Sequence, residues 1–402
     1  MWLTGQVVTP DRVLPQGRIT VEGGLITAVD AVPAGASRSE GRPAGASLTG
    51  DGSTGDRLTG DGLTGDGGLG GPDERWIVPG FVDLHNHGGG GHGYTSGVDA
   101  ARWAAGFHLS RGTTTLLASL MAAPHGELLA TATTLEPLIS AGVLAGVHYE
   151  GPYLAPAQRG AQVERYLREP CSRDIGELLA TGTAVMVTIA PELPGGIEAI
   201  EQVATHGTVA AIGHTDASHA RTVTAIRAGA RVATHLFNAM RPVHHREPGP
   251  VVALLAAPEV TCELIADGAH LHEAMLTLVV AAAGPARVAL VSDAVPMAGR
   301  PDGRHRLPDG RPVTVQGSVA RVTDASGEAL LGGTTGLDSA LRRLIRLGTA
   351  PVDAVRMVST TPAATIGRAD IGALTVGARA DLVVLDRDWQ VRRVMRAGSW
   401  TS

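Results

Sequence analysis

Two patterns of apolar and polar positions follow each other along most of the chain. Short runs of branched aliphatic residues, typical of buried strands, are separated by longer stretches whose apolar residues recur every three or four positions, as in amphipathic helices. Strand-like runs cover residues 77–84, 113–119, 144–148, 184–189, 209–212, 231–235, 261–265 and 287–291, and helix-like stretches cover 100–111, 127–141, 173–180, 196–206, 218–228, 272–283 and 338–347. Alternation of about seven or eight such units predicts parallel βα units and favours a (β/α)8 barrel over an open doubly wound sheet.

The two ends of the chain have β character instead. Short strand-like runs occur at 6–8, 18–21 and 25–29, and again at 380–385 and 390–395. We therefore predict an α/β protein with two parts. A TIM-like barrel covers residues 79–365, and a small β-sandwich domain is built from residues 1–78 and 366–402, in which the terminal segments pair with each other.

A glycine- and aspartate-rich tract interrupts the N-terminal part. The unit Leu-Thr-Gly-Asp recurs at Leu48, Leu58 and Leu63, and residues 34–73 contain too few apolar side chains to offset the entropy lost on ordering so many glycines. We predict a disordered surface loop. A calcium-binding repeat is the alternative, but such repeats need a nine-residue period, which this tract lacks.

Composition and charge exclude several classes of protein. The chain has 402 residues and a formal net charge of −6, and no run of basic residues indicates a nucleic acid or a membrane surface as partner. The N-terminus lacks the features of a signal peptide, and no apolar run reaches the ~18 residues of a membrane span. The two cysteines, Cys171 and Cys262, form no C-x-x-C pair, which fits a reducing compartment. We expect a cytoplasmic protein.

A pair of histidines marks the first candidate site. His85 and His87 follow the strand-like run at 77–84, and a glycine-rich turn follows them. In an extended segment residues i and i+2 face the same side, so both imidazoles can reach one cation beyond the strand end. By themselves, two histidines at this spacing are equally compatible with polar surface residues that close a strand.

Four other polar residues also come directly after strand-like runs. They are Glu150, His214, His235 and Asp293, and a (β/α)8 barrel places its chemistry at these strand ends. Burying the charge of Asp293 after such an apolar strand is unfavourable without a cation or proton nearby. Imidazole nitrogens and carboxylate oxygens suit zinc, iron(II) or manganese, so we predict a metal-dependent hydrolase with one or two divalent ions. Asp293 would take the proton of the attacking water and deliver it to the leaving amine.

The motifs that carry these residues resemble a known family. PGFVDLHNH, EGPYL, GHT, THLFNAM followed by REPG, DGAH, SDA, LGG and STTPAATIG are similar to the amidohydrolase superfamily and, within it, to the N-acetylglucosamine-6-phosphate deacetylases. The resemblance implies hydrolysis of the 2-acetamido group to give glucosamine 6-phosphate and acetate. It also implies that Glu150, His214 and His235 hold the main metal, that His85 and His87 complete a second metal site, and that Asp293 is the catalytic aspartate.

The same resemblance implies the contacts to substrate. Asn238, Ala239 and Arg246 match the segment that meets the sugar phosphate, and a guanidinium is a natural partner for a phosphate dianion. The family often supplies this arginine from a neighbouring subunit, which implies a homodimer. The other expected substrate contacts are His270, Ala161, Gln162 and a loop formed by Leu331, Gly332 and Gly333. Gln162 is a departure, because many relatives have a histidine near the acetyl oxygen, and glutamine cannot carry a charge.

Two alternatives stay open at this point. A related amidohydrolase could act on another N-acetyl sugar phosphate, such as N-acetylgalactosamine 6-phosphate, on an N-acyl amino acid or on a cyclic amide. A non-catalytic binding protein on the same scaffold belongs to another class, but such proteins are expected to have lost metal ligands. The pathway, whether recycling of cell-wall sugar or catabolism of external amino sugar, does not follow from the sequence.

Overall fold

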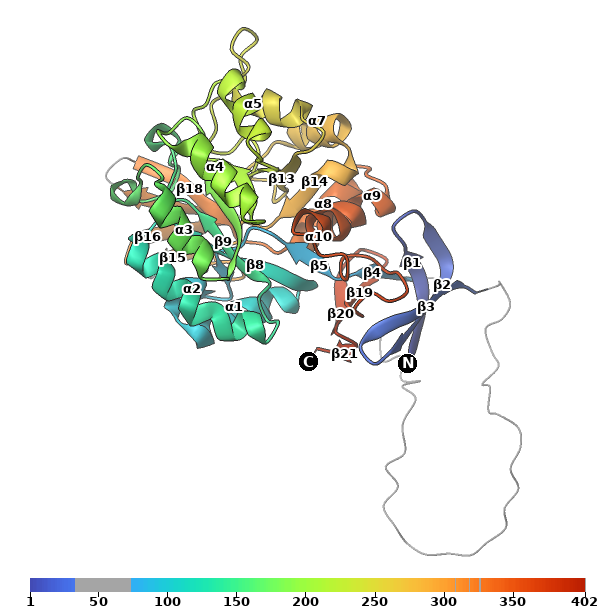
Figure 1. Ribbon diagram of the computed structural model, residues 1–402. Helices are drawn as coiled ribbons and strands as arrows, with labels where there is room; N and C mark the ends of the chain where they lie inside the picture. Colours follow the sequence, from blue (N-terminus) through green and yellow to red (C-terminus); the bar gives the residue numbers. More distant parts are fainter. Residues whose placement is uncertain (33–73, 308, 318, 325–326, 402) are drawn as a thin grey trace, which may run out of the picture.

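The structure is a computed structural model that describes residues 1–32, 74–307, 309–317, 319–324 and 327–401 (Figure 1). The tract for which we predicted a disordered loop, residues 34–73, lies outside the described residues.

Eight parallel strands form the barrel. They are β5 (Phe81–Asp83), β8 (Thr113–Met121), β9 (Gly146–Glu150), β10 (Ala184–Ile189), β11 (Val209–Ile212), β12 (Val232–Ala233), β13 (Thr261–Ile265) and β14 (Val288–Val291). Each pairs with its neighbour in chain order. Nearly all of their residues are buried on both faces, because side chains fill the inside of the barrel and helices cover the outside. The predicted (β/α)8 barrel is confirmed.

Helices follow the barrel strands in turn and surround them (Figure 1). They are α1 (Val98–Leu109), α2 (His125–Ser140), α3 (Ser172–Ala180), α4 (Gly196–Thr205), α5 (His219–Arg227), α6 (Gly249–Ala256), α7 (Glu273–Ala283) and α8 (Leu337–Arg346). Of these, α6 is the one that we did not predict. After α8 come α9 (Pro351–Val355), a π-helical segment (Arg356–Thr360) and α10 (Thr361–Thr365), and the π-helical segment contacts β5 and β14. None of the described helices is both long and apolar enough to cross a membrane.

The first and last barrel strands close the barrel beyond their regular segments. The Asp293 N–H donates to the His85 carbonyl at 2.9 Å, and the His87 N–H donates to the Ala294 carbonyl at 2.8 Å. The closure therefore joins the segment that carries the two histidines directly to the segment that carries Asp293, although about 200 residues separate them in the chain.

The two ends of the chain meet in one seven-stranded sheet, seen beside the barrel in Figure 1. Its order is β21-β20-β19-β4-β1-β2-β3, with β1 (Trp2–Val8), β2 (Val13–Glu22), β3 (Leu25–Ala31), β4 (Arg75–Pro79), β19 (Leu382–Asp386), β20 (Val391–Arg396) and β21 (Ser399–Trp400). Strand β4 joins the two ends, because it pairs parallel with β1 and antiparallel with β19. The predicted small β part is thus present, and the domain boundaries at 78/79 and 365/366 stay a prediction.

A separate four-stranded antiparallel sheet lies between β14 and α8 in the chain, and we did not predict it. It consists of β15 (Gly303–Arg306), β16 (Pro312–Gln316), β17 (Val319–Asp324) and β18 (Gly327–Gly333). Its apolar face packs on side chains of the segment after β14, among them Val295 and Met297. Apolar and polar residues alternate in these strands, as in PVTVQ at 312–316, and this is the pattern of a half-buried strand, so the sequence carried a signal for this sheet that we did not use.

The prediction of a loop at Leu331–Gly333 is wrong, because these residues form the last part of strand β18. The Gly333 N–H donates to the Asp293 carbonyl at 2.7 Å, and its own carbonyl accepts from Val295. A Cβ atom on Gly332 would lie 2.5 Å from the Asp293 carbonyl oxygen, and one on Gly333 would lie 2.4 Å from that of Ser292. Both glycines are therefore needed for β18 to approach the segment that carries Asp293.

Short elements complete the described fold. A small hairpin, β6 (Gly88–Gly89) and β7 (His92–Gly93), follows the two histidines, and 3-10 turns occur at Tyr94–Ser96, Pro156–Gln158, Glu164–Tyr166 and Pro285–Arg287.

Candidate metal centre

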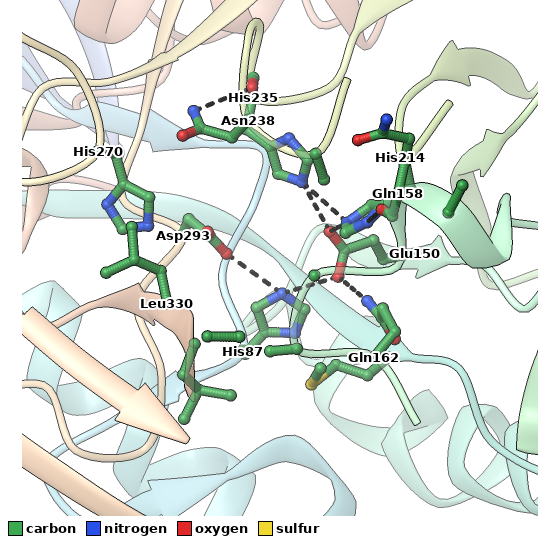
Figure 2. A pocket seen from close by; sticks show the side chains of 17 residues that line it. His87, Glu150, Gln158, Gln162, His214, His235, Asn238, His270, Asp293 and Leu330 are labelled. Carbon is green, nitrogen blue, oxygen red and sulfur yellow. Dashed lines mark hydrogen bonds and ion pairs between the residues drawn. The ribbon is translucent and has the colours of Figure 1, made fainter. Parts of the chain in front are cut away.

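Six side chains converge at the mouth of the barrel. His85 and His87 follow β5, Glu150 ends β9, His214 follows β11, His235 follows β12 and Asp293 follows β14. Each residue has 8% or less of its surface exposed. Figure 2 shows His87, Glu150, His214, His235 and Asp293 with their side chains directed toward one another. The structure thus brings together all six residues that we predicted as metal ligands.

Three of these residues have a left-handed backbone. The φ angles are 46° at His214, 29° at His235 and 44° at Asp293, and each residue lies two positions beyond the last residue of its strand. Such a conformation costs a residue other than glycine about 1–3 kcal/mol and is found mainly at functional sites. The same turn at three strand ends carries the three side chains into the cluster.

Glu150 lies at the centre of the cluster. Its Oε1 atom is 3.0 Å from Nε2 of both His214 and His235 and 3.3 Å from Nε2 of His85, and its Oε2 atom is 3.3 Å from Nε2 of His87. Burial by itself raises the pKa of Glu150, but the surrounding imidazoles outweigh it, so the pKa lies well below its usual value. Glu150 is therefore a carboxylate that touches all four histidines.

Hydrogen bonds orient three of the imidazoles. Nδ1 of His87 lies 3.1 Å from the Ser119 carbonyl oxygen, and Nδ1 of His214 lies 2.9 Å from that of Gln158. Nδ1 of His85 lies 3.2 Å from a carboxylate oxygen of Glu263. Since these oxygens are acceptors, Nδ1 of each ring carries a hydrogen, and Nε2 is the nitrogen that faces the cluster and would bind a metal.

The donor set fits divalent cations. Within this cluster, two sets of ligand atoms lie within 4.8 Å of one another, one formed by His85, Glu150 and His235 and the other by His85, His87 and Asp293. Burial lowers the pKa of His87, but hydrogen bonds to Asp293 and Glu150 outweigh it and raise the pKa to about 9. The two carboxylates thus favour positive charge here, and nitrogen and oxygen donors suit zinc, iron(II) or manganese. Which ligands would hold which of two metals stays a prediction.

A pocket of about 290 Å³ opens above the cluster (Figure 2). Of the residues that we predicted as substrate contacts, six line it: Ala161, Gln162, Asn238, Ala239, His270 and Leu331. Gly332 and Gly333 do not line the pocket, and they pack against the backbone of Ser292 and Asp293. Arg246 does not line it either, because it lies in an exposed segment with its Nη1 atom 2.8 Å from Nε2 of His245.

Gln162 holds Glu150 in place. Its Nε2 atom donates to Oε2 of Glu150 at 2.7 Å, and its Oε1 atom accepts the Ala122 N–H at 2.8 Å. Both ends of the buried amide are therefore used within the protein. Gln162 lines the pocket, as predicted, but its donor is engaged with Glu150 in this structure.

We expect Gln162→Leu to lower kcat/KM about 10- to 100-fold, because a hydrogen bond to a charged group contributes about 1.5–3 kcal/mol. Steady-state assays together with the metal content of the purified variant measure this effect. Gln202→Leu is the matched control, since Gln202 is a glutamine outside the pocket that donates to the Ser172 carbonyl. Equal activity of wild type and Gln162→Leu would show that the hydrogen bond to Glu150 is unimportant.

His270 is held at the pocket by Asp267. Nδ1 of His270 lies 2.8 Å from Oδ2 of Asp267, whose Oδ1 atom accepts the backbone N–H groups of Ala269 and His270. Burial lowers the pKa of His270, but the Asp267 carboxylate outweighs it, and the net effect is a raised pKa. His270 thus presents its other nitrogen to the pocket as a hydrogen-bond donor.

Several residues of the site were missed from the sequence. Asp83 is fully buried on β5 and accepts hydrogen bonds from the Ser292 hydroxyl at 2.6 Å and from the Asn86 amide at 3.1 Å. This network links the segment of the two histidines to the segment of Asp293. Glu263 lies inside the barrel beside His85. A lone acidic residue inside an apolar strand-like run, as in TCELI, is the signal that could have found it.

Comparison with known proteins gives consistent results. Residues 76–401 match the amidohydrolase family. The N-acetylgalactosamine-6-phosphate deacetylase of Escherichia coli O157:H7 is 33% identical over 339 residues, covering 82% of this chain and 89% of that protein. The N-acetylglucosamine-6-phosphate deacetylase of Bacillus subtilis (strain 168) is 32% identical over 336 residues, covering 80% of this chain and 83% of that protein.

A solved structure is similar over the whole chain. It is a point mutant of N-acetyl-D-glucosamine-6-phosphate deacetylase from Mycobacterium smegmatis in complex with N-acetyl-D-glucosamine 6-phosphate. It aligns with a TM-score of 0.86 and 38% identity, covering 100% of this chain and 98% of that chain.

Proposed function

The chain belongs to the amidohydrolase family, and from this premise we propose that it is a metal-dependent deacetylase. The substrate is N-acetyl-D-glucosamine 6-phosphate, which is hydrolysed to D-glucosamine 6-phosphate and acetate. The observation that carries the proposal is the buried cluster of four histidines and two carboxylates at the floor of a pocket at the carboxyl end of the barrel. Relatives with this activity and a solved substrate complex support it.

Asp293 is the proton carrier. Its Oδ1 atom lies 3.3 Å from Nε2 of His87, and the residue lines the pocket. Burial raises the pKa of Asp293, but His85 and His87 outweigh it and lower the pKa below its usual value, so the group is an ionised carboxylate at neutral pH and has a free site for a proton. Asp293 accepts a proton as water adds to the acetyl carbon, and it donates that proton to the amine as the C–N bond breaks.

Other residues of the chain would bind the metal and the substrate. Glu150 and the four histidines would bind the divalent cation, which supplies activation of water and polarisation of the acetyl carbonyl. The raised pKa of His270 makes it a donor toward a sugar hydroxyl or the acetyl oxygen. Zinc is the proposed ion, with iron(II) or manganese as alternatives.

The phosphate group requires a cation that one chain does not place in the pocket. Among the described residues that line the pocket there is no arginine, and the sequence has no lysine, so arginine is the only permanently charged basic side chain available. Arg246 lies in the exposed run 242–247 after Met240. We propose that this segment reaches a second copy of the chain in a cytoplasmic homodimer, where Arg246 binds the phosphate.

The first experiment is acetate release from N-acetylglucosamine 6-phosphate by protein of known metal content. We expect turnover of the phosphorylated sugar, loss of turnover with a chelator, and little turnover of the unphosphorylated sugar. N-Acetylgalactosamine 6-phosphate is assayed in parallel, because the relative from Escherichia coli O157:H7 bears that name. A higher kcat/KM for the galactosamine derivative would change the proposed substrate, and no turnover of either by metal-loaded protein would overturn the proposal.

We expect Arg246→Ala to lower kcat/KM for the phosphorylated sugar about 10- to 100-fold through a higher KM, since an ionic hydrogen bond contributes about 1.5–3 kcal/mol. A mixture of Arg246→Ala and Asp293→Asn chains tests the origin of the arginine. In a mixed dimer, the chain with intact Asp293 receives Arg246 from its neighbour, so two weak variants would together regain activity. No recovery in verified mixed dimers would show that Arg246 does not act across an interface.

A further inference from the structure

Glu263 is a charged residue in the interior of the barrel. It lies in the middle of β13 and is 0% exposed. Its Oε2 atom lies 3.2 Å from Nδ1 of His85 and accepts the backbone N–H of His235 at 3.1 Å, whereas its Oε1 atom has no hydrogen-bond partner among the described residues. Glu263 does not line the pocket, so it is not placed to touch substrate.

The contact with His85 determines how that imidazole faces the cluster. A carboxylate oxygen has no hydrogen to donate, so Nδ1 of His85 carries the hydrogen of this contact and Nε2 is the nitrogen directed at the cluster. This Nε2 atom lies 3.2 Å from Nε2 of His87 and 3.3 Å from Oε1 of Glu150. Negative charge on the Nδ1 side also makes Nε2 of the imidazole a stronger electron-pair donor to a metal.

The contact with His235 supports a strained turn. Strand β12 contains only Val232 and Ala233, so His235 lies beyond the strand with its φ of 29°. The side chain of Glu263 accepts the N–H of His235, and the backbone carbonyl of Glu263 accepts the N–H of Leu236 at 2.9 Å. One residue therefore holds both the ring of one ligand and the backbone of another.

The charge of Glu263 is otherwise unbalanced. Within the described part of the chain, its ion pair is with His85, and no arginine pairs with it. A fully buried carboxylate is unfavourable unless positive charge lies nearby. A divalent cation on the Nε2 side of His85 would supply that charge through the imidazole.

We infer that Glu263 is a positioning residue of the metal centre, which orients His85 and His235 and strengthens their hold on a divalent cation. The inference rests on the proposed function only as far as the cluster binds such a cation. It predicts that the carboxylate lowers the stability of the metal-free protein and raises the affinity for metal.

The test compares wild type, Glu263→Gln and Cys262→Ala in the full chain. Glutamine keeps the size of the side chain and removes its charge. Cys262 is the matched control, because it is an equally buried neighbour on β13 that packs in the outer apolar core. Zinc affinity is measured by competition with a chromophoric chelator, the thermal midpoint is measured on metal-free protein, and visible spectra are recorded with cobalt(II) at saturation.

For Glu263→Gln we expect about 10- to 100-fold weaker zinc binding, an unchanged or higher midpoint without metal, and a shifted cobalt spectrum. For Cys262→Ala we expect a lower midpoint but wild-type affinity and spectrum. Wild-type affinity and spectrum in Glu263→Gln, or losses that merely parallel a lower metal-free midpoint, would overturn the inference. Wild-type protein that binds no divalent ion would instead overturn the proposed function.

Discussion

Asp293→Asn is expected to lower kcat by about 10²- to 10⁴-fold, the range that general acid–base catalysis contributes. Asparagine has nearly the same shape as aspartate but cannot accept a proton at neutral pH. In the proposed mechanism, Asp293 accepts the proton of the water and delivers it to the amine, so one substitution would remove two steps. Acetate release and elemental analysis of the same preparation measure the effect.

The metal content separates two causes of that loss. Oδ1 of Asp293 lies 3.3 Å from Nε2 of His87 and 3.6 Å from Nε2 of His85, so Asp293 is also a candidate metal ligand. Glu150 and the other histidines are unchanged, and we therefore expect Asp293→Asn to keep bound metal. Asp30→Asn is the control, because Asp30 lies on β3 of the seven-stranded sheet, where it pairs with the exposed Arg18, and its replacement should change kcat by less than about threefold. Substantial turnover by metal-loaded Asp293→Asn would show that another group carries the proton.

Glu150→Gln is expected to abolish metal binding at ordinary concentrations. Glu150 contacts all four histidines, and removing one charged partner from a buried cluster typically costs about 3–5 kcal/mol. This corresponds to a loss of affinity between about a hundredfold and a few thousandfold, at 1.4 kcal/mol per factor of ten. Elemental analysis and chelator competition measure the metal, and acetate release measures the consequence.

Chelation of the wild type provides the comparison for this variant. Removal of the metal should abolish wild-type activity and lower the thermal midpoint, since a cation that binds only the folded state stabilises it. Added zinc should restore the wild type and not Glu150→Gln. A Glu150→Gln protein that retains a full metal complement would show that the histidines and Asp293 hold the metal without the central carboxylate.

The amino-acid sequence by itself determined the barrel and the six residues of the candidate metal centre. These depend on short-range information: strand-like and helix-like runs alternate, and a histidine, glutamate or aspartate follows the end of a run, as at His214 after residues 209–212. In parallel βα units, all strands point the same way, so residues after the strands meet at one end of the barrel. The pattern therefore predicted that His85 and Asp293 would lie close together.

Only the tertiary structure decided which residues support that centre. Glu263 and His85 are 178 positions apart in the chain, and Ser292 and Asp83 are 209 apart. The closure of the barrel brings the members of each pair into contact. The hydrogen bond from Gln162 to Glu150 depends on the path of a loop, and the approach of Gly332 and Gly333 to Asp293 depends on the four-stranded sheet, which we did not predict. The type of a residue and its spacing along a strand indicate which face of the sheet it occupies. Which residue it contacts depends on the register between strands and on the closure of the barrel, and both arise only when the whole chain packs.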